Sequence, residues 1–297
     1  MTLTKELLDV ELFLFDMDGT VYIGDKEIAG SFDAIRALKK LGKRICFFTN
    51  NSSKAAEDYI EKLHKMGLDI SRDEIYTSGE VTCEYVNRVY PGASVFVMGN
   101  EKLKAEFIRH GIKLSEDNPD LCVLGFDTEL EYWKLYRFCK WLNKGKPYIA
   151  THPDLNCPAD ECPMPDIGGM ILFINATISR NPDIIIGKPE REAGEGVKRK
   201  FNLPASKIAM VGDRLYTDIA FGFNNGFKTV LVLSIWRRYC KNFVLETYIS
   251  CNKNLVRLYV AKLFTRFIMK FCVMIFSFRQ TVTTVFWFEM KANGKVE

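Results

Sequence analysis

The amino-acid sequence predicts an α/β protein built on a parallel sheet, with a second α/β unit inserted into it. Three observations support this prediction. Short apolar segments alternate with segments of helical period, and that order is typical of βαβ units. Several apolar segments end in polar clusters, as strands do when their carboxyl ends form a binding edge. The middle of the chain repeats the alternation without such polar ends.

The main sheet and its helices are expected near the two ends of residues 1–234. Strands are predicted at residues 10–15, 44–49, 207–211 and 229–233, and helices at 31–41, 55–66, 190–201 and 215–225. Three of these strands are followed by polar clusters, which are Asp16-Met17-Asp18, Thr49-Asn50-Asn51-Ser52 and Gly212-Asp213-Arg214. Clusters of this kind are expected at the carboxyl edge of one sheet.

The middle of the chain forms a series of its own. Apolar segments at 94–98, 121–125, 148–151 and 170–178 alternate with polar ones, and no polar strand end appears until Gly187-Lys188-Pro189. The simplest arrangement is an inserted α/β domain at residues 80–183. The core is then discontinuous and comprises residues 1–79 and 184–234.

The charge distribution marks a third segment at residues 235–297. This segment has 11 Lys and Arg against 3 Asp and Glu, whereas residues 1–234 have 30 against 34. The net acidic part lacks a basic stripe, so nucleic acid is not expected as a partner. Nine scattered cysteines and an amino terminus without a signal-peptide pattern predict reduced thiols in a cytoplasmic protein.

Two carboxylates follow the first strand two residues apart, at Asp16 and Asp18. Residues i and i+2 of a strand point to the same side, so both side chains start toward one site. Acidic groups this close repel each other unless a cation lies between them. The pair therefore predicts an oxygen-preferring divalent metal, Mg²⁺ first. A polar turn without a site is the alternative, because Asp and Gly are ordinary turn formers.

Further polar groups complete the chemistry that the pair suggests. Asp213 and Asp218 add acidic positions for a metal, and Thr49 and Asn50 can donate hydrogen bonds to phosphate oxygens. Lys188, between a glycine and a proline, adds a positive point charge for the same group. Each residue also has an ordinary structural explanation, but the combination predicts a phosphate site.

The order of these motifs resembles that of the haloacid dehalogenase superfamily of phosphohydrolases. The matching phrases are Asp-x-Asp-Gly-Thr from Asp16, Thr-Asn-Asn from Thr49, Gly-Lys-Pro around Lys188, and Gly-Asp-x-x-x-Thr-Asp ending at Asp218. The long insert, with Thr151-His152-Pro153-Asp154 and Gly168-Gly169, is similar to the large cap of the NagD-like or nitrophenylphosphatase branch. The resemblance covers residues 8–234 and implies a Rossmann-like core with an inserted α/β cap.

The resemblance implies the following chemistry. Asp16 attacks phosphorus and forms an aspartyl-phosphate, and Asp18 protonates the leaving oxygen and then activates water. Mg²⁺ is held by Asp16, by the backbone carbonyl of Asp18 and by Asp213. The residues implied to bind substrate are Thr49, Asn50, Asn51 and Lys188. Asp218 is implied to orient Lys188 or a metal-bound water.

The expected function is hydrolysis of a small phosphomonoester: a nucleoside monophosphate, sugar phosphate, glycerol phosphate, phosphoglycolate or aryl phosphate. The choice among them is expected to lie in cap residues near 152–154 and 166–169, and the cap is also the expected face of a homodimer. Two alternatives stay open. One is phosphoryl transfer to another alcohol, and the other is an inactive protein that binds a phosphorylated metabolite.

Residues 235–297 depart from the family pattern. One interpretation takes residues 255–278 as a basic amphipathic helix that contacts an anionic membrane surface or a partner. The other takes the segment as a replaced ending without an evolved role, and this one is favoured because the resemblance and the charge balance change at the same place. The core sheet is then expected to expose an edge strand.

Overall fold

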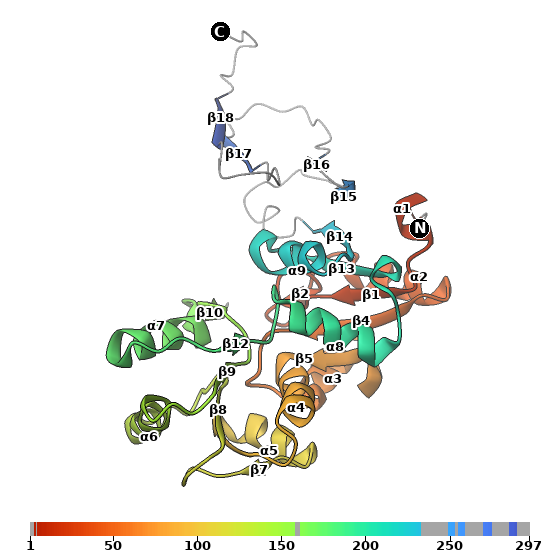
Figure 1. Cartoon of the computed structure of the whole chain (residues 1–297). Helices are drawn as coiled ribbons and strands as arrows, with labels where there is room; N and C mark the ends of the chain where they lie inside the picture. Colours follow the sequence, from red (N-terminus) through yellow and green to blue (C-terminus); the bar gives the residue numbers. More distant parts are fainter. Residues whose placement is uncertain are drawn as a thin grey trace.

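The computed structural model describes residues 3, 5–157 and 161–232, and the backbone of four further strands at 249–252, 255–258, 270–274 and 285–289. It has two parallel sheets that lie beside one another (Figure 1). The first sheet is built mainly from residues 12–77 and 208–231, and the second from residues 94–185. The chain thus leaves the first sheet, completes the second, and returns.

The first sheet carries the motif residues at its carboxyl edge. Its order is β5 (Ile75–Thr77), β4 (Arg44–Thr49), β1 (Leu12–Phe15), β13 (Ile208–Gly212), β14 (Lys228–Leu231), β15 (Ile249–Asn252) and β16 (Leu255–Leu258). The strands from β5 to β14 pair in parallel. Its helical segments are α1 (Lys5–Leu8), α2 (Ser31–Lys40), α3 (Ala56–Lys65), η1 (Arg72–Glu74), α8 (Arg191–Phe201), η2 (Ala205–Lys207), η3 (Leu215–Ile219) and α9 (Ala220–Asn224), with a hairpin β2 (Tyr22–Ile23) and β3 (Lys26–Glu27).

The second sheet is parallel throughout, unlike the first. Its order is β12 (Ile184–Ile185), β9 (Tyr148–Ala150), β8 (Leu121–Leu124), β6 (Ser94–Met98) and β7 (Lys113–Leu114). Helices α6 (Tyr132–Asn143) and α7 (Ile167–Ile178) lie on the face away from the first sheet, and α4 (Ser78–Val89) and α5 (Glu101–Arg109) lie on the other face (Figure 1). A short hairpin joins β10 (Asn156–Cys157) to β11 (Met164–Pro165).

Alternation along the strands divides the apolar side chains into three clusters. In β1, Leu12 and Leu14 face one cluster, and Phe13 and Phe15 face another. In β6, Val97 belongs to the same cluster as Leu12, whereas Phe96 and Met98 belong to the cluster that includes α6 and α7. One apolar core therefore runs from the first sheet through α4, α5 and α8 to the second. This shared core joins the two sheets, so their carboxyl edges lie near one another in the structure.

The parallel α/β prediction is confirmed. The predicted helix at 215–225 begins instead with a π-helical turn, η3, before α9. The boundaries predicted for the insert, 80 and 183, stay a prediction. Within the described residues, no helix is long and apolar enough to cross a membrane, and the six cysteines whose side chains are described are free.

The carboxyl-terminal segment differs from the expected helix and from the expected open edge at β14 where the structure describes it, and its interpretation as a replaced ending stays a prediction. The alternative of a continuous helix over 255–278 is wrong for β16 and for β17 (Lys270–Met274), which are strands, and β17 pairs with β18 (Val285–Glu289). An exposed edge at β14 was expected, but β15 pairs with it through Thr229 and Ile249. Strands β15 and β16 pair in the antiparallel sense, unlike the strands from β5 to β14. The remainder of 235–297 lies outside the described residues.

Candidate phosphate and metal site

The centre of the site is a buried lysine held between two carboxylates. The ammonium group of Lys188 lies 2.7 Å from an oxygen of Asp16 and 2.7 Å from an oxygen of Asp218, and it donates to the carbonyl of Phe48 at 3.1 Å. Asp16 follows β1, whereas Lys188 follows β12 of the second sheet. The site therefore forms where the carboxyl edges of the two sheets meet.

Asp213 completes a group of three carboxylates whose oxygens lie close together. One oxygen each of Asp16, Asp213 and Asp218 lies within 4.8 Å of the others. Thr20 donates to Oδ1 of Asp213 at 3.1 Å, while Oδ2 of Asp213 is buried without a hydrogen-bond partner among the described residues. Gly19 has φ +94°, and a Cβ there would stand 2.6 Å from Oδ2 of Asp213. The glycine is thus required for both the turn and the close approach of this carboxylate.

The charges of this group are not balanced within the protein. Burial, followed by the neighbouring Asp16, raises the pKa of Asp213 to about 7. Burial likewise raises the pKa of Asp218, although Lys188 donates to it. The pKa of Lys188 is raised because two carboxylates oppose the effect of its burial. The three carboxyl groups carry more negative charge than Lys188 offsets, and a divalent cation would neutralise the excess. Their oxygens, including the unpartnered one of Asp213, are the ligand type that such a cation prefers.

Asn50 connects the two sheets at the site. Its side-chain amide group donates to the carbonyl of Lys188 at 2.8 Å and to Asp154 at 3.2 Å, while its oxygen accepts from the backbone NH of Lys188 at 2.8 Å. A Cβ on Gly187 would stand 2.6 Å from that amide oxygen. Asn50 thus fixes the loop that presents Lys188.

Thr49 and Asn51, the other predicted substrate-binding residues, also line the pocket, but they differ in the hydrogen bonds that they already make. Thr49 accepts from the backbone NH of Asn51 through its hydroxyl at 3.1 Å. The side-chain oxygen of Asn51 accepts from the backbone NH and hydroxyl of Ser53, so this oxygen shapes its own loop. Asp18 lines the pocket, and burial, followed by the charge of Asp16, raises its pKa. Asp218 rather than Asp18 contributes the third carboxylate near Asp213.

Three further charged residues, Asp154, Asp166 and Arg214, line the pocket, and we call them the distal wall. Asp154 follows β9, Asp166 caps α7, and Arg214 follows β13. Burial raises the pKa of Asp166 to about 7. The first two lie in the region expected to set specificity, whereas Arg214 was predicted only as part of a motif. Asn156 also lines the pocket and was not predicted, whereas Thr217, another lining residue, belongs to the motif that ends at Asp218.

His152 is fully buried behind the distal wall. Its Nδ1 accepts from the backbone NH of Asp154 at 3.4 Å, which leaves the proton of the neutral ring on Nε2. Nε2 lies 3.6 Å from Asp166 and has no hydrogen-bond partner among the described residues. Burial, followed by the charge of Lys188, lowers the pKa of His152 to about 3. The ring is therefore neutral and supports the wall from behind.

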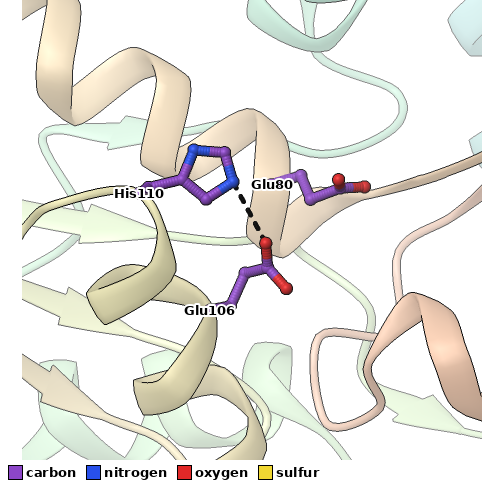
Figure 2. A group of neighbouring side chains, drawn as sticks. All are labelled: Glu80, Glu106 and His110. Atoms are coloured by element: carbon purple, nitrogen blue, oxygen red, sulfur yellow. Dashed lines mark hydrogen bonds and ion pairs between the residues drawn. The ribbon is translucent and has the colours of Figure 1, made fainter. Parts of the chain in front are cut away.

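A second acidic cluster lies away from the pocket, between α4 and α5. Figure 2 shows Glu80, Glu106 and His110 with the ring of His110 directed toward Glu106, and the two are 3.0 Å apart. Arg72 pairs with Glu80 at 2.5 Å, and Arg109 pairs with Glu106. Each carboxylate has a cationic partner, so this cluster is a structural ion-pair network. The sequence alone did not indicate it.

Comparison with known families matches both parts of the core. A sequence model of the haloacid dehalogenase-like hydrolases matches residues 13–113, and a HAD-hydrolase-like model matches residues 185–234. The first match contains Asp16, Asp18 and Thr49, and the second contains Lys188 and Asp213. The second match ends at the residue where the charge balance of the chain changes.

Individual proteins resemble most of the chain. An acid sugar phosphatase of Staphylococcus aureus is 34% identical over 221 residues, which are 74% of this chain and 85% of that protein. The structure of a 4-nitrophenylphosphatase from Thermotoga maritima has 46% identity and a TM-score of 0.75, covering 77% of this chain and 88% of the other. NagD from E. coli K-12 has 25% identity and a TM-score of 0.71, covering 76% and 88%.

Proposed function

We propose a finer function for this chain, which belongs to the haloacid dehalogenase-like hydrolases as a phosphatase of the NagD and p-nitrophenylphosphatase branch. The proposed function is that of a Mg²⁺-dependent phosphomonoesterase that forms an aspartyl-phosphate. The observation that carries this proposal is the contact of Lys188 with Asp16 and Asp218 beside the unpartnered oxygen of Asp213. Such a group binds a phosphate and a cation together.

In the first half of the reaction, a carboxylate oxygen of Asp16 attacks phosphorus, and the bond from phosphorus to the leaving oxygen breaks. Asp18 donates a proton to that oxygen, and its raised pKa suits this role because burial favours the protonated acid. Lys188, held at 2.7 Å from Asp16, binds phosphoryl oxygens at the attacking carboxylate. Thr49 and Asn51 offer further donors from the carboxyl end of β4.

In the second half, Asp18 accepts a proton from water while the water oxygen attacks phosphorus, which releases phosphate and restores Asp16. Asp16, Asp213 and the backbone carbonyl of Asp18 would hold the metal. When bound, Mg²⁺ supplies positive charge that stabilises the transferring phosphoryl group. Asp218 orients Lys188 through the 2.7 Å contact. The loop after β9 and strand β10 line the pocket beside these groups.

The test is phosphate release from p-nitrophenyl phosphate and a metabolite panel, with Mg²⁺ and with a chelator. We expect metal-dependent release, and we expect Asp16→Asn to reduce it about 10⁴-fold or more because the nucleophile is lost. Asp9→Asn, an exposed change just before the same strand, is the matched control and keeps full activity.

Three outcomes would change the proposal. Substantial turnover by Asp16→Asn would reject the nucleophile. Transfer of phosphate to an added alcohol in preference to water would favour the phosphotransferase. Binding of phosphorylated metabolites without release from any substrate would favour the inactive binding protein.

A further inference from the structure

Arg214 has a fixed backbone. Its NH donates to Oδ2 of Asp218 at 3.2 Å, and its carbonyl accepts from the NH groups of Asp218 at 3.0 Å and Ile219 at 3.2 Å. The other oxygen of Asp218 accepts from Lys188 at 2.7 Å. One buried carboxylate therefore positions both Lys188 and the segment that carries Arg214.

The side chain of Arg214, in contrast, is unengaged. Arg214 lines the pocket and is half-buried, but its guanidinium group forms neither a hydrogen bond nor an ion pair in the described part of the chain. Among the carboxylates around it, that of Asp16 stabilises its positive charge most, ahead of Asp154 and Asp213. A guanidinium group has five NH donors, and leaving all of them unused beside a pocket is costly. The group is therefore suited to a ligand that lies near Asp16.

The donors of Lys188 and Asn50, in contrast, are already in use. An ammonium group has three NH donors, and Lys188 directs them to two carboxylates and one backbone carbonyl. Asn50 likewise donates twice within the protein. Lys188 can therefore bind a phosphoryl oxygen only by exchanging one of these contacts. Among the described residues that line the pocket, Arg214 is the cation whose donors are all unused.

A phosphoryl group in transfer needs donors of this kind. Its charge is spread over three oxygens outside the line of attack. The planar fork of a guanidinium group matches two such oxygens, whereas an ammonium group is a point charge. We propose that Arg214 is a second cationic ligand of the phosphoryl group and donates to its oxygens beside Lys188. This inference rests on the proposed phosphatase function and adds to it a contact that does not depend on the leaving group.

The first experiment compares Arg214→Gln and Arg214→Lys with the wild type in the presence of Mg²⁺. It measures kcat/KM for p-nitrophenyl phosphate and for the best-hydrolysed alkyl phosphate of the panel. Arg214→Gln should lose about 100-fold on both substrates, because two hydrogen bonds to a charged group are removed and all substrates share the phosphoryl group. Arg214→Lys should lose about 10-fold, because it keeps the charge but not the fork.

The second experiment needs no turnover and uses orthovanadate as a phosphoryl analogue. With Mg²⁺ present, orthovanadate should raise the melting temperature of the wild type, and its Kd for Arg214→Gln should be about 100-fold higher. The response of Arg214→Gln to Mg²⁺ alone should persist, and so should its stability in urea, because the guanidinium group has no partner within the protein. The matched control is Arg137→Gln, the same change at an exposed arginine of α6 outside the pocket lining, and it should behave as the wild type.

Three outcomes would overturn the contact. The first is unchanged kcat/KM and vanadate affinity in Arg214→Gln. The second is a loss confined to one leaving group, which would place Arg214 against that group instead. The third is a loss of vanadate binding together with stability in urea, which would show a structural role. A wild type that hydrolyses no substrate but binds vanadate through Arg214 would defeat the proposed function and support the contact, which separates the two failures.

Discussion

Two buried acidic clusters in this molecule have similar spacing but different charge balance. The potential ligand atoms of Glu80, Glu106 and His110 lie within 4.8 Å of one another, as do those of Asp16, Asp213 and Asp218. In the first cluster, shown in Figure 2, Arg72 pairs with Glu80 and Arg109 pairs with Glu106. In the second, a single lysine serves the group and one oxygen of Asp213 is unpartnered. Close ligand atoms therefore do not mark a site; unbalanced charge and an unused oxygen do.

The largest expected effect distinguishes the clusters by their response to metal. Asp213→Asn removes one charge and one oxygen ligand, so we expect activity to fall about 10³-fold, equivalent to about 4 kcal/mol of lost charge stabilisation. The rise in melting temperature on adding Mg²⁺ should disappear as well. A metal ion present at 100 times its Kd raises the free energy of unfolding by about 2.7 kcal/mol, and thermal unfolding can detect that increase.

Glu106→Gln provides the counterpart to Asp213→Asn. It should keep the Mg²⁺ response of the wild type, because Glu106 lies in the balanced cluster. If both variants lost the metal response, or if neither did, the distinction between the clusters would fail.

The next effect concerns stability rather than activity. Glu106→Gln leaves Arg109 and His110 without their carboxylate, and the glutamate side chain is largely buried. We expect a loss of about 1–3 kcal/mol in the free energy of unfolding, because a charged hydrogen bond is removed from a partly solvated pair. Urea unfolding measures the loss, and phosphate release should stay at the wild-type rate. An activity defect without a stability defect would contradict the structural role.

The smallest effect is a pH dependence of the balanced cluster. The hydrogen bond to Glu106 raises the pKa of His110. The charges of Glu80 and Glu84 act on the ring in the same direction, and Arg109 lies nearby, paired with Glu106. Because the folded-state pKa is above the unfolded one, this contribution is fully present below pH about 6.5 and is lost as the pH rises through the raised value. Wild type should therefore lose more stability than His110→Gln between pH 6 and 8.5. Urea unfolding of both proteins at the two pH values measures this difference. An equal change in the free energy of unfolding in the two proteins would argue against the linkage.

Much of the fold could be predicted because its strands are short, apolar and alternate between two faces. The strands predicted at 44–49 and 94–98 match β4 and β6 at both ends. The start of α9 was less predictable, because the π-helical turn depends on how Asp218 packs against Lys188 and Gly212. Neighbours in the sequence do not determine that contact.

The candidate site divides in the same way. Asp16, Asp18, Lys188 and Asp213 stand in short motifs with a characteristic order, and a motif can be detected without coordinates. Arg214 was named in the polar cluster after its strand but given no role, because the motif allows many residues at that position. Glu80 and Glu106 were overlooked because they occupy ordinary helical positions, and only the packing of α4 against α5 brings them together.

The sequence by itself determined the alternating parallel architecture and the polar residues at the carboxyl ends of β1, β4 and β13, because both follow from local pattern. Only the tertiary structure decided which carboxylates share Lys188 and which acidic cluster is neutralised by arginines. These properties depend on distances between segments far apart in the chain. The shared apolar core between the two sheets sets those distances.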